Sequence, residues 1–363
     1  MTSSSIGPPK HIAALDGWRA FAILMLLWGH GTRGWIHLPF NTGFCAVNFF
    51  FVLSGFLITY RLLTDYSVDQ NIQFRKFYIR RIFRILPPAF LYLGVVLLLG
   101  LLGKIPVWAG EVVSGALFSR NYVGIPAGHA AGTGWFTGHF WSLAVEEHFY
   151  LLWPVALHLA KPKRAKWVAI GGIVACAAWR FGALHFGLGS LPNVPFYFRT
   201  DTRFDALLIG SLLGVCYADT ALRKTLSQLV ARRDTAIILG LYVWVLLRMF
   251  EPADLKELFL VAGLLAVTSL HPESWLGTIL QFAPIRWIGR ISYSLYIWQQ
   301  LFLTPEGLKP LGLLNRTPID IVATFCLATL SFYLVEMPMI NLGYRLSRRS
   351  ESSKLVPSVV AGA

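Results

Sequence analysis

The sequence predicts an all-α protein that crosses a membrane about ten times, with both termini in the cytoplasm. Hydrophobic residues make up 55% of the 363 residues and charged residues only 14%, whereas a typical soluble domain carries about 25% charged residues. The mean hydropathy is +0.57, and apolar runs recur along the whole chain. This composition excludes a disordered chain, a disulfide-rich scaffold and an ordinary soluble enzyme.

Ten segments have the apolar character of a membrane helix, which needs about 20 residues to cross the hydrocarbon core. Because ten such helices use about 200 residues, we expect a single membrane domain over residues 1–363 with short loops. Its core is expected at about 10–340, with flexible tails at 1–10 and 345–363 and no further soluble domain. The predicted segments are 18–36, 43–63, 86–103, 136–159, 167–186, 204–218, 235–250, 255–271, 287–303 and 319–336.

The distribution of basic residues sets the expected orientation. Alternate loops, counted with the tails and a few flanking residues, hold 20 Lys and Arg on one side and 7 on the other. Since cytoplasmic loops are enriched in Lys and Arg, this places both termini in the cytoplasm. The formal charge of +14 then indicates contact with anionic lipid headgroups or an anionic substrate, and no nucleic-acid partner is expected. Residues 1–17 do not read as a cleavable signal peptide.

The cysteines are far apart, lie in apolar surroundings and include no C-x-x-C pair. We therefore predict buried thiols that form neither a disulfide nor a zinc site. The four positions are Cys45, Cys176, Cys216 and Cys326.

Polar residues inside the predicted spans are the informative ones, because an ionisable group in hydrocarbon normally faces a cavity or a partner. Arg19 and His30 are eleven residues apart, which is close to three helical turns. Both therefore lie on one face of the first helix, about 16 Å apart along its axis. An alternative interpretation, a packing histidine and a snorkelling arginine, explains the pair equally well when it is taken alone.

Arg81 and Arg84 enter the third segment from the cytoplasm and share a helix face at i, i+3. Guanidinium groups bind phosphates in a bidentate manner, so the pair is a candidate phosphate site. A topology signal that also contacts lipid headgroups is the favoured alternative as long as the pair is considered by itself.

Two adjacent carboxylates, Glu146 and Glu147, interrupt the fourth segment. Adjacent residues point about 100° apart on a helix, so the two cannot serve one site equally. Ser142, Glu146 and Tyr150 form a stripe at i, i+4. A purely structural role for both carboxylates is disfavoured because their desolvation is costly without partners. Further polar positions, which local hydrogen bonding would explain, are Asn48, Ser54, Arg203, Asp205, Ser292, Tyr293, Ser294, Tyr296, Gln299 and Glu336.

Seven motifs of this chain resemble those of the membrane-bound acyltransferase family 3, a large family of bacterial O-acyltransferases. They follow the family's order and extend over about residues 10–340. The motifs are LDGWRAFAILMLLWGH at 15–30, VNFFFVLSGFLIT at 47–59, FYIRRIFRILPP at 77–88, WSLAVEEHFYLLWP at 141–154, TRFDALLIGSLLG at 202–214, IGRISYSLYIWQQ at 288–300 and VEMPM at 335–339.

The resemblance implies a multi-pass enzyme of the bacterial inner (cytoplasmic) membrane with a ten-helix core. It implies transfer of an acyl group, foremost acetyl, from cytoplasmic acyl-CoA to a hydroxyl of a sugar, polysaccharide or glycolipid. The family's Arg-x10-His pair maps onto Arg19 and His30, its Arg-x-x-Arg element onto Arg81 and Arg84, and its tryptophan-serine-acidic element onto Trp141, Ser142, Glu146 and Glu147.

Three positions depart from the family pattern. Asn48 stands where aspartate is common, Gln299 where histidine is common, and Trp18 where leucine is common. The first departure weakens a catalytic role for position 48, and the second argues against another catalytic histidine at position 299. Many relatives also carry a soluble esterase-like domain after the membrane core, which we do not expect in this chain.

A thioester is already activated, so its transfer needs a base and charge stabilisation but neither ATP nor a metal ion. We predict that His30 deprotonates the acceptor hydroxyl, or is itself acylated in a variant mechanism. Glu146, or as the less favoured alternative Glu147, is predicted to orient the imidazole. Arg19, Arg81 and Arg84 are predicted to hold the phosphates of acyl-CoA, and further predicted contacts to the substrates come from Trp141, Ser142, Glu147, Asn48, Arg203 and Tyr296.

A transporter or flippase for an acylated sugar or lipid is the main alternative, since polar residues lining a helical bundle would suit it as well. The cytoplasmic arginines and the absence of a visible inverted repeat favour the enzyme. A non-catalytic scaffold explains the carboxylates and the histidine inside the spans poorly. Oligomeric state, acyl chain length and the acceptor are left open by the residues.

Overall fold

The computed structural model of the chain describes residues 12–31, 41–189, 191, 193–230, 234–248, 255–305 and 308–352. These residues form helices and connecting loops, and none of them lies in a β-strand. The predicted all-α fold class is therefore confirmed. Each of the ten predicted membrane segments coincides with at least one helix.

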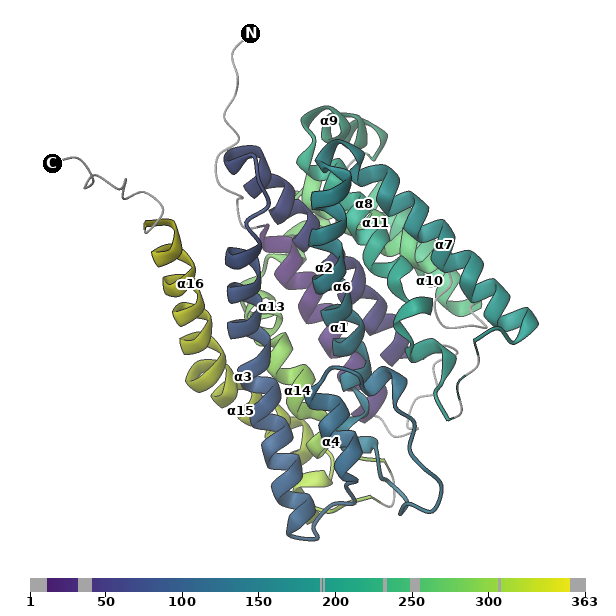
Figure 1. Cartoon of the computed structure of the whole chain (residues 1–363), viewed down its shortest axis with the longest axis vertical. Helices are drawn as coiled ribbons and strands as arrows, with labels where there is room; N and C mark the ends of the chain where they lie inside the picture. Colours follow the sequence, from purple (N-terminus) through teal and green to yellow (C-terminus); the bar gives the residue numbers. More distant parts are fainter. Residues whose placement is uncertain are drawn as a thin grey trace, which may run out of the picture.

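Sixteen α-helices make up the described chain (Figure 1). Their bounds are α1 Ala13–Gly31, α2 Thr42–Asp69, α3 Phe74–Leu101, α4 Ala109–Ala116, α5 Trp135–Gly138, α6 Phe140–Ala160, α7 Ala165–Phe186, α8 Phe204–Ala218, α9 Thr220–Leu229, α10 Asp234–Arg248, α11 Leu255–Leu270, α12 Trp275–Leu280, α13 Ala283–Arg290, α14 Ser292–Phe302, α15 Ile319–Ser331 and α16 Met337–Ser352. Short 3₁₀ turns are η1 Arg120–Tyr122, η2 Pro162–Arg164, η3 Phe196–Phe198, η4 Thr200–Thr202 and η5 Gly312–Asn315, and a π-turn, η6, spans Phe332–Glu336.

Among the residues that the structure describes, four stretches are long and apolar enough to cross a membrane by length and composition. They are Thr42–Asp69, Phe74–Leu101, Pro162–Phe186 and Ile319–Arg348, and α8 with α9, bent by 106°, makes a fifth if the pair counts as one span. Large apolar side chains on the outer faces of α3 and α7 are exposed, which is the surface that lipid covers. The count of ten spans and the cytoplasmic side of the termini stay predictions.

Helix boundaries differ from the sequence prediction where local signals act. α1 begins at Ala13 rather than at residue 18, and Asp16 lies in its first turn, where a negative charge stabilises a helix N-terminus. The ninth segment is two helices, α13 and α14, joined at Ile291. The tenth passes through the π-turn into α16, which continues to Ser352 and into the segment predicted as a tail.

The cysteines show the limit of reading burial from an apolar context. All four are free. Cys45 and Cys176 are buried as predicted, but Cys216 is half-buried and Cys326 is exposed on α15. The prediction was wrong at these two positions because the outer face of a membrane helix is as apolar as its inner face.

Helix α2 lies at the centre of the bundle and packs against α1 and α8. Its contact with α8 is close because of two glycines. A Cβ atom on Gly55 would lie 1.9 Å from the Leu207 carbonyl oxygen, and one on Gly210 would lie 2.0 Å from the Val52 carbonyl oxygen. Small residues allow such close backbone approach between membrane helices.

The two ends of the bundle differ in the elements that they bring together. The start of α3, the end of α16 and α9 lie at one end, uppermost in Figure 1, and α4 lies at the opposite end. Arg75, Arg80 and Arg81 belong to the first turns of α3. We call this the basic end and the other the α4 end. Helix α1 connects them, because Arg19 borders a cavity with α3 and His30 borders one with α5.

Candidate active site

A cavity of about 700 Å³ lies inside the bundle near the basic end. We call it the arginine cavity, because Arg19 of α1 and Arg81 and Arg84 of α3 contribute three guanidinium groups to its wall. The remaining lining residues include both polar and aromatic side chains: Val47, Phe50, Phe51, Leu53, Ser54, Ile85, Ser142, Leu143, Glu146, Tyr150, Ser292, Tyr293 and Tyr296.

The guanidinium groups of this cavity form no direct ion pair among the described residues, although the carboxylates of Asp16, Glu146, Glu147 and Glu336 act on them at longer range. Arg19 and Arg84 form no hydrogen bond or ion pair with any residue that the structure describes. The Arg81 guanidinium lies over the Tyr150 ring, 4.4 Å from its centroid. Glu146 is the carboxylate on the wall, and it accepts a hydrogen bond of 2.5 Å from Ser54 Oγ. Several guanidinium groups with no carboxylate in direct contact are a favourable environment for an anion.

Two further hollows share arginine side chains with the arginine cavity and lie toward the basic end. Arg81 and Arg84 line both of them, and their volumes are about 910 and 1010 Å³. Additional charged groups there come from Arg61, Asp65, Lys76 and Arg80. The i, i+3 spacing that predicted a shared face for Arg81 and Arg84 thus corresponds to side chains that line the same three hollows.

His30 lines a second cavity, of about 730 Å³, toward the α4 end. We call it the histidine cavity. Its wall is rich in aromatic rings, and it also includes the side chains of a second histidine and a glutamine. The lining residues are Leu26, His30, Asn41, Gly43, Phe44, Val47, Gly134, Trp135, Gly138, His139, Trp141, Phe198, Tyr296 and Gln300.

The imidazole of His30 is held by Gln299 of α14. His30 Nδ1–H donates to Gln299 Oε1 over 2.8 Å, and the Trp135 ring lies edge-to-face at 5.7 Å. Gln299 is fully buried. With Nδ1 protonated, the lone pair of His30 is on Nε2, as a general base requires.

The sequence assigned the partner of His30 to Glu146 or Glu147, and this assignment needs correction. Glu146 lines the arginine cavity and bonds Ser54, while Gln299 takes the expected position at His30. The stripe along α6 does place Ser142, Glu146 and Tyr150 on one cavity. That cavity is simply not the one that His30 faces.

Tyr296 and Val47 belong to the wall that separates the two cavities, since both line each of them. The hydroxyl of Tyr296 donates to the His139 carbonyl oxygen at 2.9 Å and lies 2.5 Å from Ser142 Oγ. Trp141, the neighbour of Ser142, faces the histidine cavity. The arginine cavity and the histidine cavity therefore share a wall to which the Tyr296 hydroxyl contributes.

Comparison with known proteins identifies the family of this chain. The family model described as an acyltransferase domain matches residues 12–306. The chain belongs to this acyltransferase family. No solved structure matches the chain.

Curated members of the family resemble this chain over most of its length. It is 31% identical to the putative peptidoglycan O-acetyltransferase YrhL of Bacillus subtilis (strain 168), with 94% of this chain and 57% of the relative covered. It is 29% identical to the peptidoglycan O-acetyltransferase OatA of Listeria monocytogenes (92% and 57%) and 28% identical to the O-acetyltransferase OatA of Staphylococcus aureus (93% and 58%). The chain thus spans a little over half the length of these relatives.

Two predicted site residues of the acyltransferase lie away from both cavities. Asn48 and Arg203 are fully buried and bonded to each other, with Arg203 Nη2 donating to Asn48 Oδ1. Asn48 Nδ2 in turn donates to Glu257 Oε2 at 2.6 Å. Glu147, the second carboxylate of the α6 pair, does not line either cavity.

Sequence reasoning missed functional candidates that are polar residues inside apolar segments. On sequence alone, Gln299 is a polar interruption and a departure from the family pattern that is given no role, and neither Gln300 nor His139 is singled out. Both glutamines interrupt a predicted span, which is a signal that could have singled them out. Glu336, buried at the end of the π-turn, accepts a 2.8 Å hydrogen bond from Ser294 Oγ. In the described residues no three His, Cys, Asp or Glu side chains are grouped to hold a metal ion.

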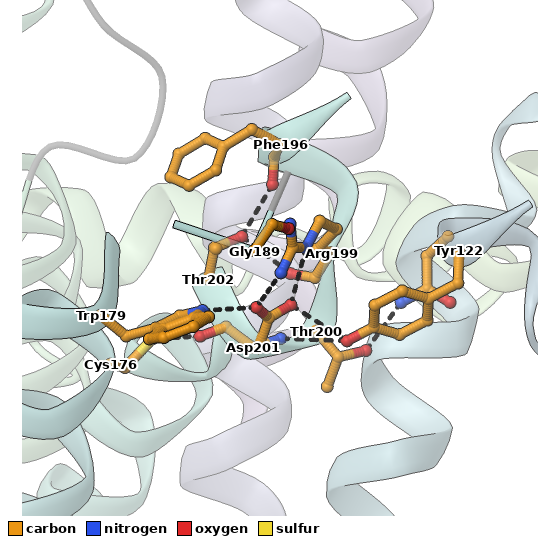
Figure 2. Close-up of polar contacts among 10 residues, drawn as sticks. Tyr122, Cys176, Trp179, Gly189, Phe196, Arg199, Thr200, Asp201 and Thr202 are labelled. Carbon is orange, nitrogen blue, oxygen red and sulfur yellow. Dashed lines mark hydrogen bonds and ion pairs between the residues drawn. The ribbon is translucent and has the colours of Figure 1, made fainter. Parts of the chain in front are cut away.

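A polar cluster at the α4 end fixes the loop that carries Phe198 into the histidine cavity (Figure 2). Asp201 is its centre. Its carboxylate accepts hydrogen bonds from Arg199 and from Trp179 Nε1, both at 2.5 Å, and from the Tyr122 hydroxyl at 3.1 Å. Three segments far apart in the chain are thereby joined next to the cavity wall.

We expect Asp201→Asn to destabilise the acyltransferase by about 2 kcal/mol at pH 7, the scale of hydrogen bonds to a charged group. Burial raises the pKa of Asp201, but the hydrogen bonds from Arg199 and Trp179 outweigh it and hold the pKa below its usual value. The carboxylate's contribution is therefore present above about pH 4 and is lost as the pH falls below it. Unfolding of both proteins in detergent at pH 7 and pH 3 measures this, and an equal difference at both pH values would contradict it.

Proposed function

We propose that the chain is a membrane O-acyltransferase that moves an acyl group, foremost acetyl, from cytoplasmic acyl-CoA to a hydroxyl of a carbohydrate acceptor. The observation that supports it most is that the guanidinium groups of Arg19, Arg81 and Arg84 line a cavity that shares part of its wall with a second cavity, which contains His30. Membership of the acyltransferase family and the peptidoglycan O-acetyltransferases among its relatives support the same reaction.

In this proposal the phosphates of acyl-CoA bind from the basic end. The guanidinium groups neutralise them through charge-assisted hydrogen bonds, and the acyl-pantetheine arm extends through the arginine cavity toward Tyr296. The same basic end faces the cytoplasm by the positive-inside rule, which is where acyl-CoA is available. Location in the bacterial inner membrane is part of the same proposal and is supported by membership of the family.

The carbohydrate acceptor is proposed to enter the histidine cavity. A sugar ring presents flat C–H faces and hydroxyl edges, so its sites combine aromatic rings with side-chain hydrogen-bonding groups. Phe44 and Trp135 supply rings, and Asn41 and Gln300 supply amides on this wall. His30 lines the same cavity, so its imidazole faces the space in which a bound acceptor hydroxyl would lie.

Transfer then requires one proton movement and one exchange of bonds at carbon. His30 Nε2 takes the proton of the acceptor hydroxyl as its oxygen attacks the thioester carbon. The new C–O bond forms, the C–S bond breaks, and the sulfur of CoA leaves with the electron pair and takes up a proton. In the proposal the Ser142 hydroxyl, which lies 2.5 Å from the Tyr296 oxygen at the shared wall, turns to donate to the thioester oxygen.

Arg81→Ala and Arg84→Ala should each raise the Kd for acetyl-CoA about 10- to 100-fold, because a hydrogen bond to a charged group contributes about 1.5–3 kcal/mol. Isothermal titration of the detergent-purified full chain measures this. Arg75→Ala on the same helix is the matched control, since Arg75 is exposed and lines none of these cavities. Unchanged Kd values for both cavity variants would overturn the donor site.

An experiment that detects a new ester bond distinguishes the enzyme from the transporter alternative. Radiolabelled acetyl-CoA is supplied to membranes that contain the chain, and the label is followed into the carbohydrate fraction. We expect an ester-linked label that mild alkali releases. Movement of intact donor or acceptor across the membrane without a new ester would contradict the enzyme.

A further inference from the structure

Two consecutive glutamines at the end of α14 each bind a different histidine of the same cavity. Gln299 Oε1 accepts from His30 Nδ1 at 2.8 Å, and Gln300 Oε1 accepts from His139 Nδ1 at 2.5 Å. Gln300 Oε1 also accepts from the backbone N–H of His139 at 3.2 Å. With the carboxamide oxygens in these positions, which can only accept, each imidazole is assigned its proton on Nδ1.

The two histidines differ in their access to the cavity. His139 is 3% exposed and is enclosed by the rings of Tyr92, Phe140 and Tyr296, with centroids 4.9–5.5 Å away. His30 is half-buried, at the end of α1. Of the two imidazoles, that of His30 is therefore the more accessible to a ligand.

The Gln299 amide makes one side-chain hydrogen bond among the described residues, the one to His30, because its buried Nε2 has no partner there. It is fully buried on α14 between Trp298 and Gln300, which are 3% and 6% exposed. Its side chain reaches α1 across 269 residues of sequence. A side chain held in this way fixes both the ring orientation and the tautomer of its histidine partner.

We propose that Gln299 is a positioning residue that locks His30 in the Nδ1-protonated tautomer, so that Nε2 faces the acceptor as the base. The assignment rests on the proposed function for its purpose, but the tautomer itself is a property of the folded chain. An uncharged amide in this position orients the ring without adding a charge that would hold it protonated. This distinguishes the arrangement from a histidine–carboxylate pair, in which the carboxylate stabilises the imidazolium.

Few ionisable groups line the cavity around His30, so the effect of a charge introduced at position 299 on the His30 titration can be measured by itself. His139, at the junction of α5 and α6, and Tyr296 of α14 are the titratable groups that share the cavity wall with His30. The wall contributed by α2 and the residue before it consists of Asn41, Gly43, Phe44 and Val47, and α5 contributes Trp135. No described Asp, Glu, Lys or Arg lines the histidine cavity. A carboxylate introduced at position 299 would be the first charge next to the ring.

The test is imidazole nitrogen NMR of the full chain labelled with ¹⁵N-histidine in detergent. The chain has 9 histidines, and the signals of His30 are those missing in His30→Ala. We expect a protonated Nδ1 and an unprotonated Nε2 in the neutral ring. The opposite tautomer, with the proton on Nε2, would overturn the proposal whether or not the protein turns over acyl-CoA.

Gln299→Glu keeps the acceptor oxygen and adds a charge, so the titration midpoint of His30 should rise by about 1–2 pH units. Gln300→Glu is the matched control, one residue away, and should move the His139 signals and leave the His30 midpoint within about 0.3 units because it bonds the other ring. Equal shifts of His30 in both variants, or no shift in Gln299→Glu, would contradict a specific Gln299–His30 bond.

Measurements of turnover distinguish a failure of this proposal from a failure of the proposed function on which it rests. In Gln299→Leu the hydrogen bond is lost, and we expect CoA release to fall about 10- to 100-fold in kcat while the Kd for acetyl-CoA stays unchanged. Gln299→Glu should recover part of the rate with the acidic limb of its pH profile displaced upward. If the wild type transfers acetyl groups and loses this with His30→Ala but not with Gln299→Leu, the positioning role is wrong and the proposed function stands. If the wild type itself fails to release CoA, the proposed function fails and the tautomer experiment still decides the bond.

Discussion

His30→Ala is expected to lower acyl transfer about 10²- to 10⁴-fold, the range over which a positioned general base acts, while acetyl-CoA binding is retained. The physical reason is the division of the site into two cavities. The proposed phosphate ligands Arg19, Arg81 and Arg84 line the arginine cavity, and the imidazole lines the histidine cavity beyond Tyr296. Removing the imidazole therefore affects the proton transfer and leaves the proposed phosphate contacts in place.

The measurement pairs CoA release, followed with a thiol reagent, with isothermal titration of acetyl-CoA into the same preparation. His129→Ala is the matched control, because His129 is exposed on the loop before α5 and bonds only the Pro126 carbonyl oxygen among the described residues. It should retain the wild-type rate. Full activity of a folded His30→Ala protein would exclude the base assignment, and loss of binding together with activity would mean that the two cavities act as one donor site.

Glu257→Gln is expected to destabilise the protein by about 3 kcal/mol or more, because it removes the carboxylate from a buried charge network. Arg203 and Asn48 are fully buried, and Asn48 relays between the guanidinium and Glu257 on α11. Nε and Nη1 of Arg203 have no hydrogen-bond partner among the described residues. The Arg203 charge is then left with weaker compensation in a low-dielectric interior.

A second substitution should reverse this loss. In the resemblance noted above, aspartate is common at position 48, where this chain has asparagine. In Asn48→Asp with Glu257→Gln, the carboxylate at position 48 accepts from Arg203 and from the amide at position 257. The number of hydrogen bonds and the net charge are both preserved. We therefore expect the double variant to recover most of the stability, a coupling of about 2 kcal/mol or more.

Denaturant titration in mixed micelles measures the four proteins of this cycle. Asn48→Asp alone should also be destabilised, because it places two carboxylates next to one guanidinium. Glu273→Gln serves as the control, since Glu273 has a 55% exposed side chain with a 3.6 Å contact to His271 and surface pairs contribute little. Additive losses in the double variant would show that Asn48 does not relay charge between Arg203 and Glu257.

Properties that depend on local periodicity were predictable from the chain. The apolar runs located the helices, and for α8 the predicted range 204–218 agrees with the structure. The spacing of Arg81 and Arg84 anticipated that they line common cavities, and the stripe of α6 anticipated that Ser142 and Glu146 do so. These inferences need only the geometry of one helix, which the order of residues determines.

The partner of His30 was beyond the reach of such reasoning. Gln299 lies 269 residues away in sequence, and Glu257 lies 209 residues from Asn48. Periodicity places a residue on a face of its own helix but does not say which helix packs there. Glu146 was the plausible choice on the basis of charge, yet α6 turns it toward Ser54 and Arg81.

By itself, then, the order of residues determined an all-α membrane chain, its family, the helical segments and the polar residues that had to avoid lipid. Tertiary structure alone decided which of those polar residues meet. It put the arginines and His30 in separate cavities on either side of Tyr296, and it gave the imidazole an amide rather than a carboxylate as its partner. The reason is that burial cost is a property of a single residue and its segment, whereas a hydrogen bond requires two segments to pack at a particular distance and rotation.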